Sequence, residues 1–388
     1  MIDVLVVGAG PAGAIAAKVM AERGMRVLLL DRARFPRHKL CGDALNPGAV
    51  AILRQLGLVD AVESSALRID GMRLTGHGVS IYARYPRPCY GLSIARRDLD
   101  GRLVDAAARA GARIEEGVVV RAPLLDTRDG KPWVRGVVLA TANNRPLRVA
   151  APITIAADGR RSTMALALGL IRQPKRPRRW AIGGYFEGVE RLEPFGEMHV
   201  RLDHYLGVAP VPGGLANACL VTADRRGFAN PTRRLVEALR QDHLLGPRFA
   251  RARLVAATTT LGPLAVEGGA AGVDGLLLAG DAAGFVDPMT GDGLRLAFAS
   301  ALLAAEAALE AWNGRADAAH ERLARRRRAQ LVGKLRFNRA VRRLVSSPWG
   351  VRMSERTASM APALFERLIL FAGDLPRERE RGTVPFFP

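Results

Sequence analysis

The sequence predicts an α/β fold: a doubly wound, mostly parallel sheet with an inserted antiparallel-sheet domain and a helical C-terminal appendix. Three observations lead to this prediction. Apolar runs alternate with helix-like segments up to about residue 65, which is typical of βαβ units. Glycine-rich turns follow apolar runs near both ends of the chain, at residues 8–13 and 280–293. Between them, residues 180–224 change to short alternating runs that favour antiparallel strands.

The first element is a strand at residues 3–7, followed directly by the sequence GAGPAG at residues 8–13. In such a motif the glycines permit a tight turn, a close approach of the backbone to a pyrophosphate, and close packing of helix on strand. A helix predicted at 11–23 would direct its N-terminal amides at the phosphates. A second strand at 26–30 ends at Asp31, whose carboxylate can accept hydrogen bonds from a ribose diol. The unit predicts a dinucleotide site, and by itself leaves FAD and NAD as alternatives.

The next elements form two blocks. The first is predicted as a helix at 47–56, short antiparallel strands within 67–85, a helix at 98–110 and strands at 117–120, 134–140 and 153–157. The second is predicted as antiparallel strands at 180–187, 197–202, 205–211 and 216–222, a helix at 232–241 and a strand at 253–260. The predicted domains are a discontinuous cofactor domain (1–66, 96–171 and 262–345), a substrate domain (67–95 and 172–261) and the helical appendix (346–388), whose last residues, 383–388, are unfavourable for helix.

The second glycine-rich turn has the same physical form as the first. Apolar residues 276–279 predict a buried strand that ends at the Gly280-Asp281 pair. A glycine-rich loop continues to residue 293 and opens into a long Ala/Leu helix. This turn can close over the far end of a long dinucleotide whose pyrophosphate the first motif holds. The two turns together indicate a single bound FAD.

Four motifs in this order resemble the para-hydroxybenzoate hydroxylase-fold flavoproteins, which include aromatic-ring monooxygenases, flavin halogenases and geranylgeranyl reductases. The motifs are Gly8-x-Gly10-x-x-Gly13, Arg96-x-x-Leu99-Asp100, Ala157-Asp158-Gly159-x-x-Ser162 and Gly280-Asp281-x-x-Gly284. The match spans residues 1–345 approximately. This resemblance implies that the parallel sheet forms a Rossmann-like FAD-binding domain.

The resemblance also implies roles for individual residues. Asp281 would bind the ribityl chain, Arg96 would lie near the ribityl chain or pyrophosphate, and the loop 288–294 would offer backbone amides to the flavin pyrimidine edge. Asp158 would lie near flavin and nicotinamide, with a solvated turn as the alternative. The predicted FAD-binding residues are Gly8, Gly10, Pro11, Ala12, Gly13, Asp31, Arg32, Cys41, Gly42, Arg96, Asp158, Asp281, Pro288, Gly291, Gly293 and Leu294.

The segment 39–43 distinguishes among these flavoproteins. Its Cys41-Gly42 pair resembles that of geranylgeranyl reductase-type proteins, in which the pair lies beside the flavin. A redox disulfide is disfavoured because the next cysteine is Cys89, and the scattered tryptophans do not resemble the Trp-rich signature of tryptophan halogenases. Residues 203–212 correspond to the substrate-domain strand of prenyl reductases and keep its Tyr and prolines but lack its Trp and Phe, which leaves the substrate open.

Three residues are candidates for catalysis. Cys41 is a candidate thiol that faces the flavin and helps to protonate the substrate, with a small packing residue as the alternative. Asp43 is a candidate general acid, with a turn or helix-cap acid as the alternative. Tyr205 is a candidate for lining the substrate pocket and, as an alternative to Cys41, for donating a proton to the substrate. The histidines show no metal-ligand spacing, so we predict no metal site.

The cysteine content and the hydrophobicity pattern indicate the cellular compartment. Three cysteines give no paired framework and indicate a reducing environment. A first strand that begins at residue 2 or 3 leaves no room for a signal peptide, and no apolar run reaches the length of about 18 residues that a membrane span needs. We therefore predict a cytoplasmic protein.

The net charge of +21 is concentrated in part at residues 322–343, where ten residues are Arg or Lys. Apolar residues recur among them at helical spacing, so the segment predicts a helix with one packed and one solvated face. A peripheral contact with anionic lipid, or a contact with a protein partner, is the alternative. A nucleic-acid partner is disfavoured because no recognised module accompanies the charge.

These features predict an FAD-dependent oxidoreductase that acts on a small apolar or aromatic substrate by reductase-like hydride transfer from reduced flavin. The first alternative is a monooxygenase that uses NAD(P)H and oxygen on an aromatic or protein-bound substrate. The second is a flavoprotein that acts as a partner-dependent maturation factor. No second GxGxxG unit is visible, so NAD(P)H would serve as a transient electron donor.

Overall fold

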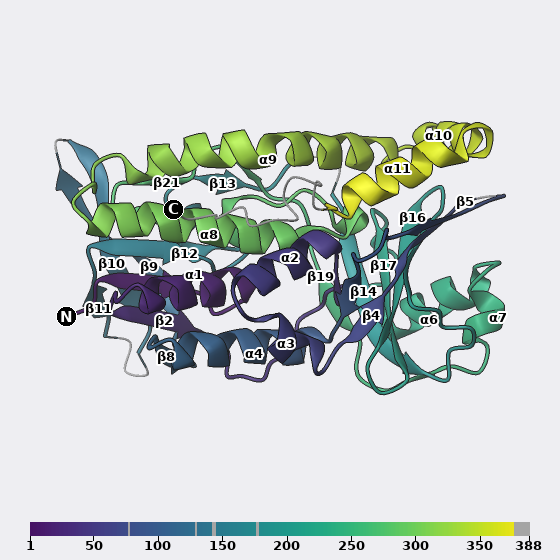
Figure 1. Cartoon of the computed structure of the whole chain (residues 1–388), viewed down its shortest axis with the longest axis horizontal. Coiled ribbons are helices and arrows are strands. Elements are labelled where there is room, and N and C mark those ends of the chain that lie inside the picture. Colours follow the sequence, from purple (N-terminus) through teal and green to yellow (C-terminus); the bar gives the residue numbers. More distant parts are fainter. Residues whose placement is uncertain (77, 129, 142–144, 176–177, 376–388) are drawn as a thin grey trace.

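A six-stranded, mostly parallel sheet forms the half of the molecule that contains both glycine-rich turns (Figure 1). The computed structural model describes residues 1–76, 78–128, 130–141, 145–175 and 178–375. The strand order is β21-β22-β12-β1-β2-β8, and the edge strand β21 runs antiparallel to its neighbour. The strands are β1 (Val4–Val7), β2 (Val27–Asp31), β8 (Arg113–Glu116), β12 (Ile153–Ala156), β21 (Gly272–Val273) and β22 (Leu276–Leu278).

Both faces of this sheet are covered, which explains why its central strands β1 and β12 are buried at every position and almost entirely apolar. Val4 and Val6 of β1 belong to the core on the helical face, and Leu5 and Val7 belong to the core on the opposite face. The helical face is covered by α1 (Pro11–Glu22), α4 (Arg96–Arg109) and α8 (Gly293–Trp312). The other face is covered by the antiparallel strands β9 (Val120–Arg128), β10 (Lys131–Leu139) and β11 (Leu147–Ala150).

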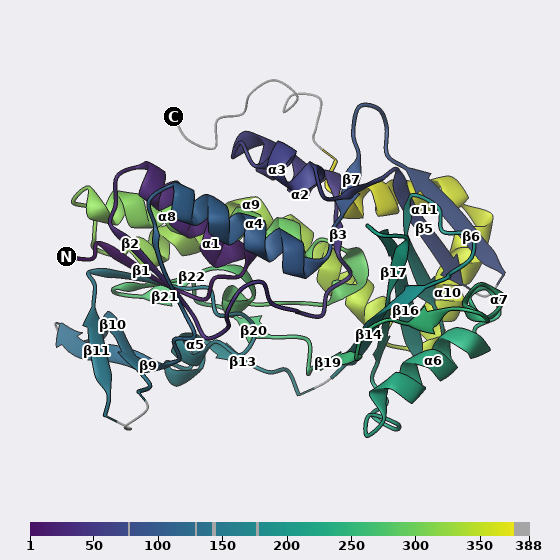
Figure 2. The same cartoon turned by 90° about the horizontal axis from the view of Figure 1, so that it is seen from below.

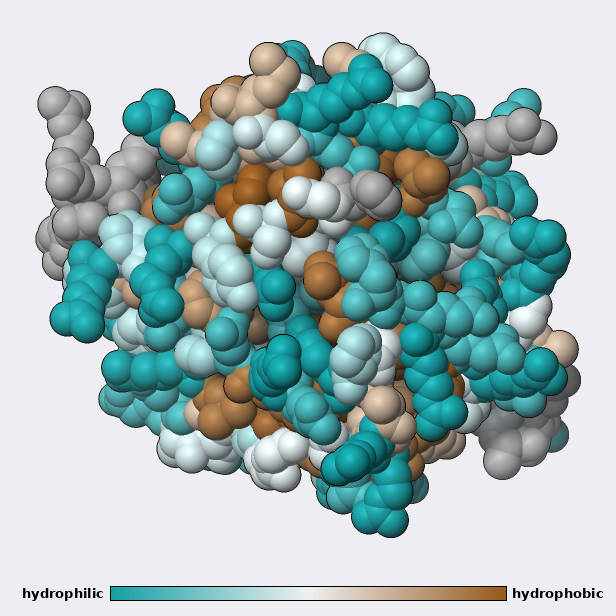
Figure 3. Space-filling model, turned by 90° about the vertical axis from the view of Figure 1, so that its right-hand side faces the viewer, coloured by the Kyte–Doolittle hydropathy of each residue, from teal (hydrophilic) through white to brown (hydrophobic). Residues whose placement is uncertain are grey.

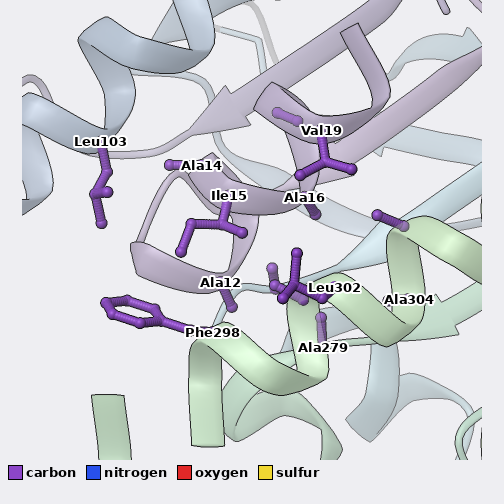
Figure 4. Close-up of a cluster of buried hydrophobic side chains, with 14 of the residues drawn as sticks. Ala12, Ala14, Ile15, Ala16, Val19, Leu103, Ala279, Phe298, Leu302 and Ala304 are labelled. Carbon is purple, nitrogen blue, oxygen red and sulfur yellow. The ribbon is translucent and has the colours of Figure 1, made fainter. Parts of the chain in front are cut away.

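Small side chains let α1 and α8 approach each other closely around the fully buried Phe298 (Figure 4). Ala12 and Ala16 of α1 and Leu302 of α8 lie in the same cluster. Because α1 begins at the end of β1 and α8 begins at the end of the second glycine-rich turn, this packing brings both turns to the same edge of the sheet.

An eight-stranded sheet forms the second half of the molecule, at the right of Figure 1. Its strands are antiparallel apart from the parallel pair β5–β15, and α6 (Pro231–Gln241) and α7 (Gly246–Phe249) pack on one face. The strands are β5 (Gly71–Gly76), β6 (Val79–Arg84), β14 (Trp180–Glu187), β15 (Phe195–Val200), β16 (His204–Val211), β17 (Leu215–Thr222), β18 (Arg253–Leu254) and β19 (Thr259–Leu261).

Short elements connect the two sheets (Figure 2). Strand β7 pairs with both β3 and β4 in a three-stranded sheet, and β13 pairs with β20. These elements are β3 (Ala44–Leu45), β4 (Leu67–Ile69), β7 (Gly91–Ser93), β13 (Ile171–Arg172), β20 (Glu267–Gly268), α2 (Pro47–Gln55), α3 (Val59–Glu63), α5 (Thr163–Ala167) and the 3₁₀ turns η1 (Gly280–Ala283) and η2 (Pro288–Thr290).

Three helices end the described chain: α9 (Ala319–Leu344), α10 (Pro348–Met360) and α11 (Pro362–Ala372). Helix α9 runs along α8, and α10 and α11 cross to the eight-stranded sheet (Figure 1). The buried Lys334 of α9 donates hydrogen bonds to the carbonyls of Phe371 (3.0 Å) and Ala372 (2.7 Å) at the end of α11. Its ammonium also lies 3.1 Å from Asp374 and 3.6 Å from Asp292. One lysine therefore joins the C-terminal helices to the start of α8.

The predicted fold class is confirmed, and the local differences have physical reasons. Of the strand predicted at 117–120, residues 117–119 form a turn, because Gly117 has a φ of 74° and turns the chain between β8 and β9, which begins at Val120. The strand predicted at 253–260 is two short strands, β18 and β19. The predicted antiparallel sheet contains one parallel pair, β5–β15, because β5 comes from a segment far earlier in the chain. Residues 383–388 lie outside the described residues, and the domain boundaries stay predictions.

Within the described ranges, we find no helix that combines the length and hydrophobicity needed to cross a membrane.

Replacing Lys334 with Met should loosen α11. The change leaves the buried carboxylate of Asp292 and the partly exposed carboxylate of Asp374 without this counter-charge, which typically costs about 3–5 kcal/mol for a buried pair. Urea unfolding should show this loss, and protease cleavage near α11 should accelerate. The matched control is Arg336→Met, two residues away on the exposed side of the same helix. Equal unfolding midpoints for the two variants would contradict the role given to Lys334.

Candidate functional site

The three glycines of the first motif have different surroundings. A Cβ at Gly8 would lie 2.6 Å from the Ala157 carbonyl oxygen, and a Cβ at Gly13 would lie 1.8 Å from the Gly8 carbonyl oxygen. These two glycines are therefore required by the packing of the protein itself. A Cβ at Gly10 would meet only the Arg37 guanidinium, at 3.5 Å. The space beside Gly10 is open to a ligand, as the close approach of a pyrophosphate requires.

The groups around this space suit an anion. Helix α1 begins at Pro11 after Gly10, and no side chain caps its first turn, so backbone amides remain available there. The buried Arg37 Nε and Arg160 Nη1 find no hydrogen-bond partner among the described residues. Burial, followed by the nearby Arg96, lowers the pKa of Lys39 to about 8. Unpaired donors and a destabilised ammonium fit a pyrophosphate, so the residues present fit FAD.

A cavity extends from Gly10 to the eight-stranded sheet. Arg160 and Asp281 face each other on its wall, with 3.9 Å between Nε and Oδ2. Predicted residues that line this cavity are Gly10, Pro11, Ala12, Cys41, Gly42, Arg96, Tyr205, Asp281, Pro288, Gly291, Gly293 and Leu294. We call this space the flavin cavity.

Three other predicted residues, Asp31, Arg32 and Asp158, do not line the flavin cavity. Both carboxylate oxygens of Asp31 accept backbone hydrogen bonds, from Ala9 (2.7 Å) and Ala33 (2.8 Å), so Asp31 fixes the glycine-rich turn. Each oxygen retains a second lone pair for a ribose hydroxyl. The neighbouring Arg32 is exposed. Asp158 accepts from the Thr163 amide at 2.8 Å at the start of α5, and burial raises the pKa of its carboxyl group.

The positive charge of Arg96 is balanced by an ion pair within its own helix. Its guanidinium donates two hydrogen bonds of 2.8 Å to Asp100 one turn later, and Arg37 lies 3.2 Å from the same carboxylate. All of these groups are buried or nearly so. The pairing holds Arg96 rigidly in the wall of the flavin cavity.

Asp43 is the centre of a buried hydrogen-bond network behind Cys41. Its carboxylate accepts from the Tyr185 hydroxyl (2.6 Å), the Asn217 amide (2.5 Å) and the backbone of Arg96 (3.2 Å). Burial raises the pKa of the Asp43 carboxyl to about 6, although these donors oppose the rise. Asp43 also has a φ of 56°, an unusual value for a residue with a side chain, so the segment 41–43 is tightly constrained.

The same network fixes the backbone of Cys41. The Asn217 amide donates to the Cys41 carbonyl at 2.9 Å, and the Cys219 thiol lies 3.5 Å from that oxygen. Cys41, Asn217 and Cys219 line the flavin cavity, and burial raises the pKa of Cys219. The sequence analysis missed Tyr185 and Asn217, which are directly opposite each other on β14 and β17. The one sequence feature that could have identified these two residues is that each is a polar side chain within an otherwise apolar strand.

Tyr205 lines the flavin cavity, but its hydroxyl group is hydrogen-bonded to another residue. It donates to Asp287 at 2.6 Å, and burial raises the pKa of Tyr205. Arg179 lies 3.3 Å from the same carboxylate and donates to the Val345 carbonyl at 2.6 Å. Tyr205 therefore connects the eight-stranded sheet to the loop before α8 and to the end of α9.

A second cavity adjoins the flavin cavity and is almost entirely apolar. Residues of both cavities are Ala44, Met72, Met198 and Gly291, which mark the junction. From there the second cavity extends beneath the C-terminal helices, and we call it the apolar cavity. Its walls include Ile69, Leu74, Phe337, Val341, Val351, Phe365 and Ile369.

In the part of the chain that the structure describes, we find no cluster of three or more His, Cys, Asp or Glu side chains arranged to hold a metal ion.

Comparison with known proteins agrees with this geometry. Residues 1–234 match the model of a family described as an FAD binding domain. The chain is 34% identical over 326 residues to a menaquinone reductase of Mycolicibacterium smegmatis, covering 78% of this chain and 75% of the relative. It is 31% identical over 322 residues to a digeranylgeranylglycerophospholipid reductase of Methanosarcina mazei, covering 80% and 75%. The myxobacterial chondrochloren halogenase CndH has a similar fold, with a TM-score of 0.81, 25% identity and coverage of 97% and 91%.

Two alanine substitutions should separate the roles of the glycines. Gly10→Ala should leave the folding of the apoprotein unchanged but weaken FAD binding by about tenfold or more, because its methyl group occupies the ligand space. Gly13→Ala should lower the melting temperature of the apoprotein, because its methyl group collides with the Gly8 carbonyl. FAD titration and thermal melting of both variants test this pair. An apoprotein destabilised equally by both changes would contradict it.

The stability contribution of Asp43 should depend on pH. Its pKa is raised from 3.8 to about 6, so as pH rises from about 4 to about 6 the unfolded chain releases a proton that the folded chain retains. Wild type should therefore lose up to about 3 kcal/mol of stability across this window relative to Asp43→Asn. Melting temperatures of the two proteins, measured from pH 4 to pH 7, should diverge in favour of the variant. Parallel curves would show that the carboxyl titrates normally.

Proposed function

Because the chain belongs to the family of FAD-dependent oxidoreductases with this FAD binding domain, we propose that it reduces a carbon–carbon double bond in an elongated, apolar substrate. The observation that supports this most directly is the junction of the two cavities: the flavin cavity continues into the apolar cavity. A substrate with its reactive bond beside Cys41 could place a long hydrocarbon chain beneath the C-terminal helices. This extends the small substrate predicted from the sequence to a longer one.

The names of two relatives support the same substrate class. One is named for the reduction of menaquinone and the other for the reduction of digeranylgeranylglycerophospholipid, and both compounds are lipids. In this proposal the apolar cavity excludes water and binds the chain through the hydrophobic effect. The polar residues lie at the other end, in the flavin cavity, where they orient the reactive group.

FAD would be held by Gly10, the N-terminus of α1, Arg160 and Asp281, and when bound it supplies the electrons for the reduction. Hydride transfer adds one hydrogen to the double bond, so the substrate also requires one proton from the protein. In this proposal the thiol of Cys41 is the proton donor at the cavity wall. Asn217 acts as a positioning residue, because its amide donates to both the Cys41 carbonyl and Asp43 Oδ2.

The activity is tested with purified, FAD-loaded protein reduced anaerobically by dithionite, with NADH and NADPH compared as electron donors. A menaquinone, a digeranylgeranyl lipid and a short isoprenoid alcohol are offered separately. Mass spectrometry should detect a product with two added hydrogens. Incorporation of oxygen in air would favour the monooxygenase, and an FAD-loaded protein that turns over none of these compounds would favour the partner-dependent role.

Met72→Trp should change the preference for chain length. Met72 lines both cavities, and a larger side chain at the junction should exclude a long chain at a cost of about 1–3 kcal/mol. The rate with the long-chain lipid should fall roughly tenfold relative to wild type, while the short alcohol is still reduced. The ratio of the two rates is the internal control, because a damaged flavin site would lower both. An unchanged ratio would show that the apolar cavity does not hold the chain.

A further inference from the structure

Helix α10 has an apolar stripe on its outer face. Trp349, Met353 and Met360 are 72%, 38% and 86% exposed, and their spacing of four and seven residues puts them on one side of the helix. Val351 and Ala358, on the opposite side, are buried against the protein. The stripe is therefore not the packing face of α10.

Helix α11 repeats this arrangement. Leu364, Leu368 and Phe371 are 49%, 38% and 50% exposed and recur at a spacing of four and three residues, which also corresponds to one side of a helix. Phe365 and Ile369, on the inner side, line the apolar cavity, which Leu368 also reaches. The half-exposed Phe371 ring packs edge-on against Phe337 of α9, with 5.0 Å between the ring centroids. Helices α10 and α11 thus both expose apolar side chains. We call the exposed face that these two helices form the α10–α11 surface.

The charges around the α10–α11 surface have one predominant sign. The acidic residues of α10 and α11 are Glu355 and Glu366. Exposed arginines on these helices and on the last turns of α9 are Arg336, Arg339, Arg343, Arg352, Arg356 and Arg367. Arg352 and Arg356 lie beside the apolar stripe of α10, at the spacing of adjacent helical turns. Figure 3 looks onto this end of the molecule and shows apolar side chains exposed between hydrophilic ones.

We propose that the α10–α11 surface docks the protein on an anionic lipid bilayer. Exposed apolar side chains between arginines are the features of a helix that lies in a membrane interface, with its apolar face among the acyl chains and its cations at the headgroups. The apolar cavity lies directly beneath the same helices. Docking would place that cavity against the hydrocarbon of the bilayer. That the cavity receives a lipid substrate there rests on the proposed function, whereas the docking itself does not.

The basic run in the first half of α9 contributes less than its sequence suggests. Arg326 pairs with Glu310 at 2.5 Å and with Glu306 at 3.5 Å, and Arg327 donates to the Ala283 carbonyl at 2.8 Å. These side chains attach α9 to α8 and to the second glycine-rich turn. Arg325 and Arg328 remain exposed there.

The experiment measures co-sedimentation of FAD-loaded protein with vesicles of phosphatidylcholine, with and without phosphatidylglycerol. Wild type should bind the anionic vesicles, and added salt should weaken binding. The triple variant Trp349→Ser/Met353→Ser/Met360→Ser and the double variant Arg352→Gln/Arg356→Gln should each bind roughly tenfold or more weakly. Matched controls are Trp312→Ser, a 42% exposed tryptophan at the end of α8, and Arg325→Gln/Arg328→Gln, and both should bind like wild type.

Several results would overturn the proposal. These are no binding by wild type, equal binding to neutral and anionic vesicles, or binding that the arginine controls abolish and the α10 variants retain. A stable dimer of the wild type that the triple variant dissociates would assign the surface to a second copy of the chain instead. FAD content, measured in every variant, separates docking from the flavin site. Vesicle binding without turnover of any lipid would remove the proposed function and leave docking intact.

Discussion

The close approach of α1 to the end of β1 is the constraint on which the rest of the site depends. Only 1.8 Å separates the Gly8 carbonyl oxygen from the place where a Gly13 Cβ would be, so the two backbones are in direct contact. This contact aims the first turn of α1 across the end of the sheet and leaves the space beside Gly10 open. Helix α8 then packs on α1 through small side chains, which brings Asp281 to the same space. A larger residue at either glycine would displace both ends of the flavin cavity.

Two buried polar networks join the halves of the molecule. In the first, Asp43 from the N-terminal half accepts from Tyr185 and Asn217 of the eight-stranded sheet. In the second, Tyr205 of that sheet donates to Asp287, which Arg179 connects to the end of α9. Leaving one member of such a network unpaired is costly in a low-dielectric interior. The networks therefore fix the relative position of the cofactor and substrate halves, and not only the chemistry of the wall.

Features that depend on residues close together in the sequence could be predicted, and features that depend on contacts between distant segments could not. The glycine-rich turns and the lining residues Gly10 and Asp281 could be predicted, because a turn and the strand before it lie within a few residues of each other. Tyr185 and Asn217 could not, because their proximity to Asp43 depends on the pairing of β14 with β17. The charge at 322–343 was visible, but its partners Glu306 and Glu310 lie on another helix. Periodicity indicates which side of a helix is apolar, and says nothing about what covers that side.

The distribution of polarity along the joined cavities has a consequence for how a substrate is oriented. Arginine and lysine side chains surround one end, near Gly10, and hydrocarbon side chains surround the other, beneath α10 and α11. Reversing an amphiphilic molecule in this space would place its chain among desolvated cations and its polar group among apolar walls, and both are unfavourable. In the proposed function, the cavities would thus favour one orientation before any contact specific to the substrate is made. The constrained segment at Asp43 holds Cys41 in the wall of the flavin cavity, three residues before Ala44 at the junction, where in the proposed reaction a bond next to an apolar chain would meet a protic group.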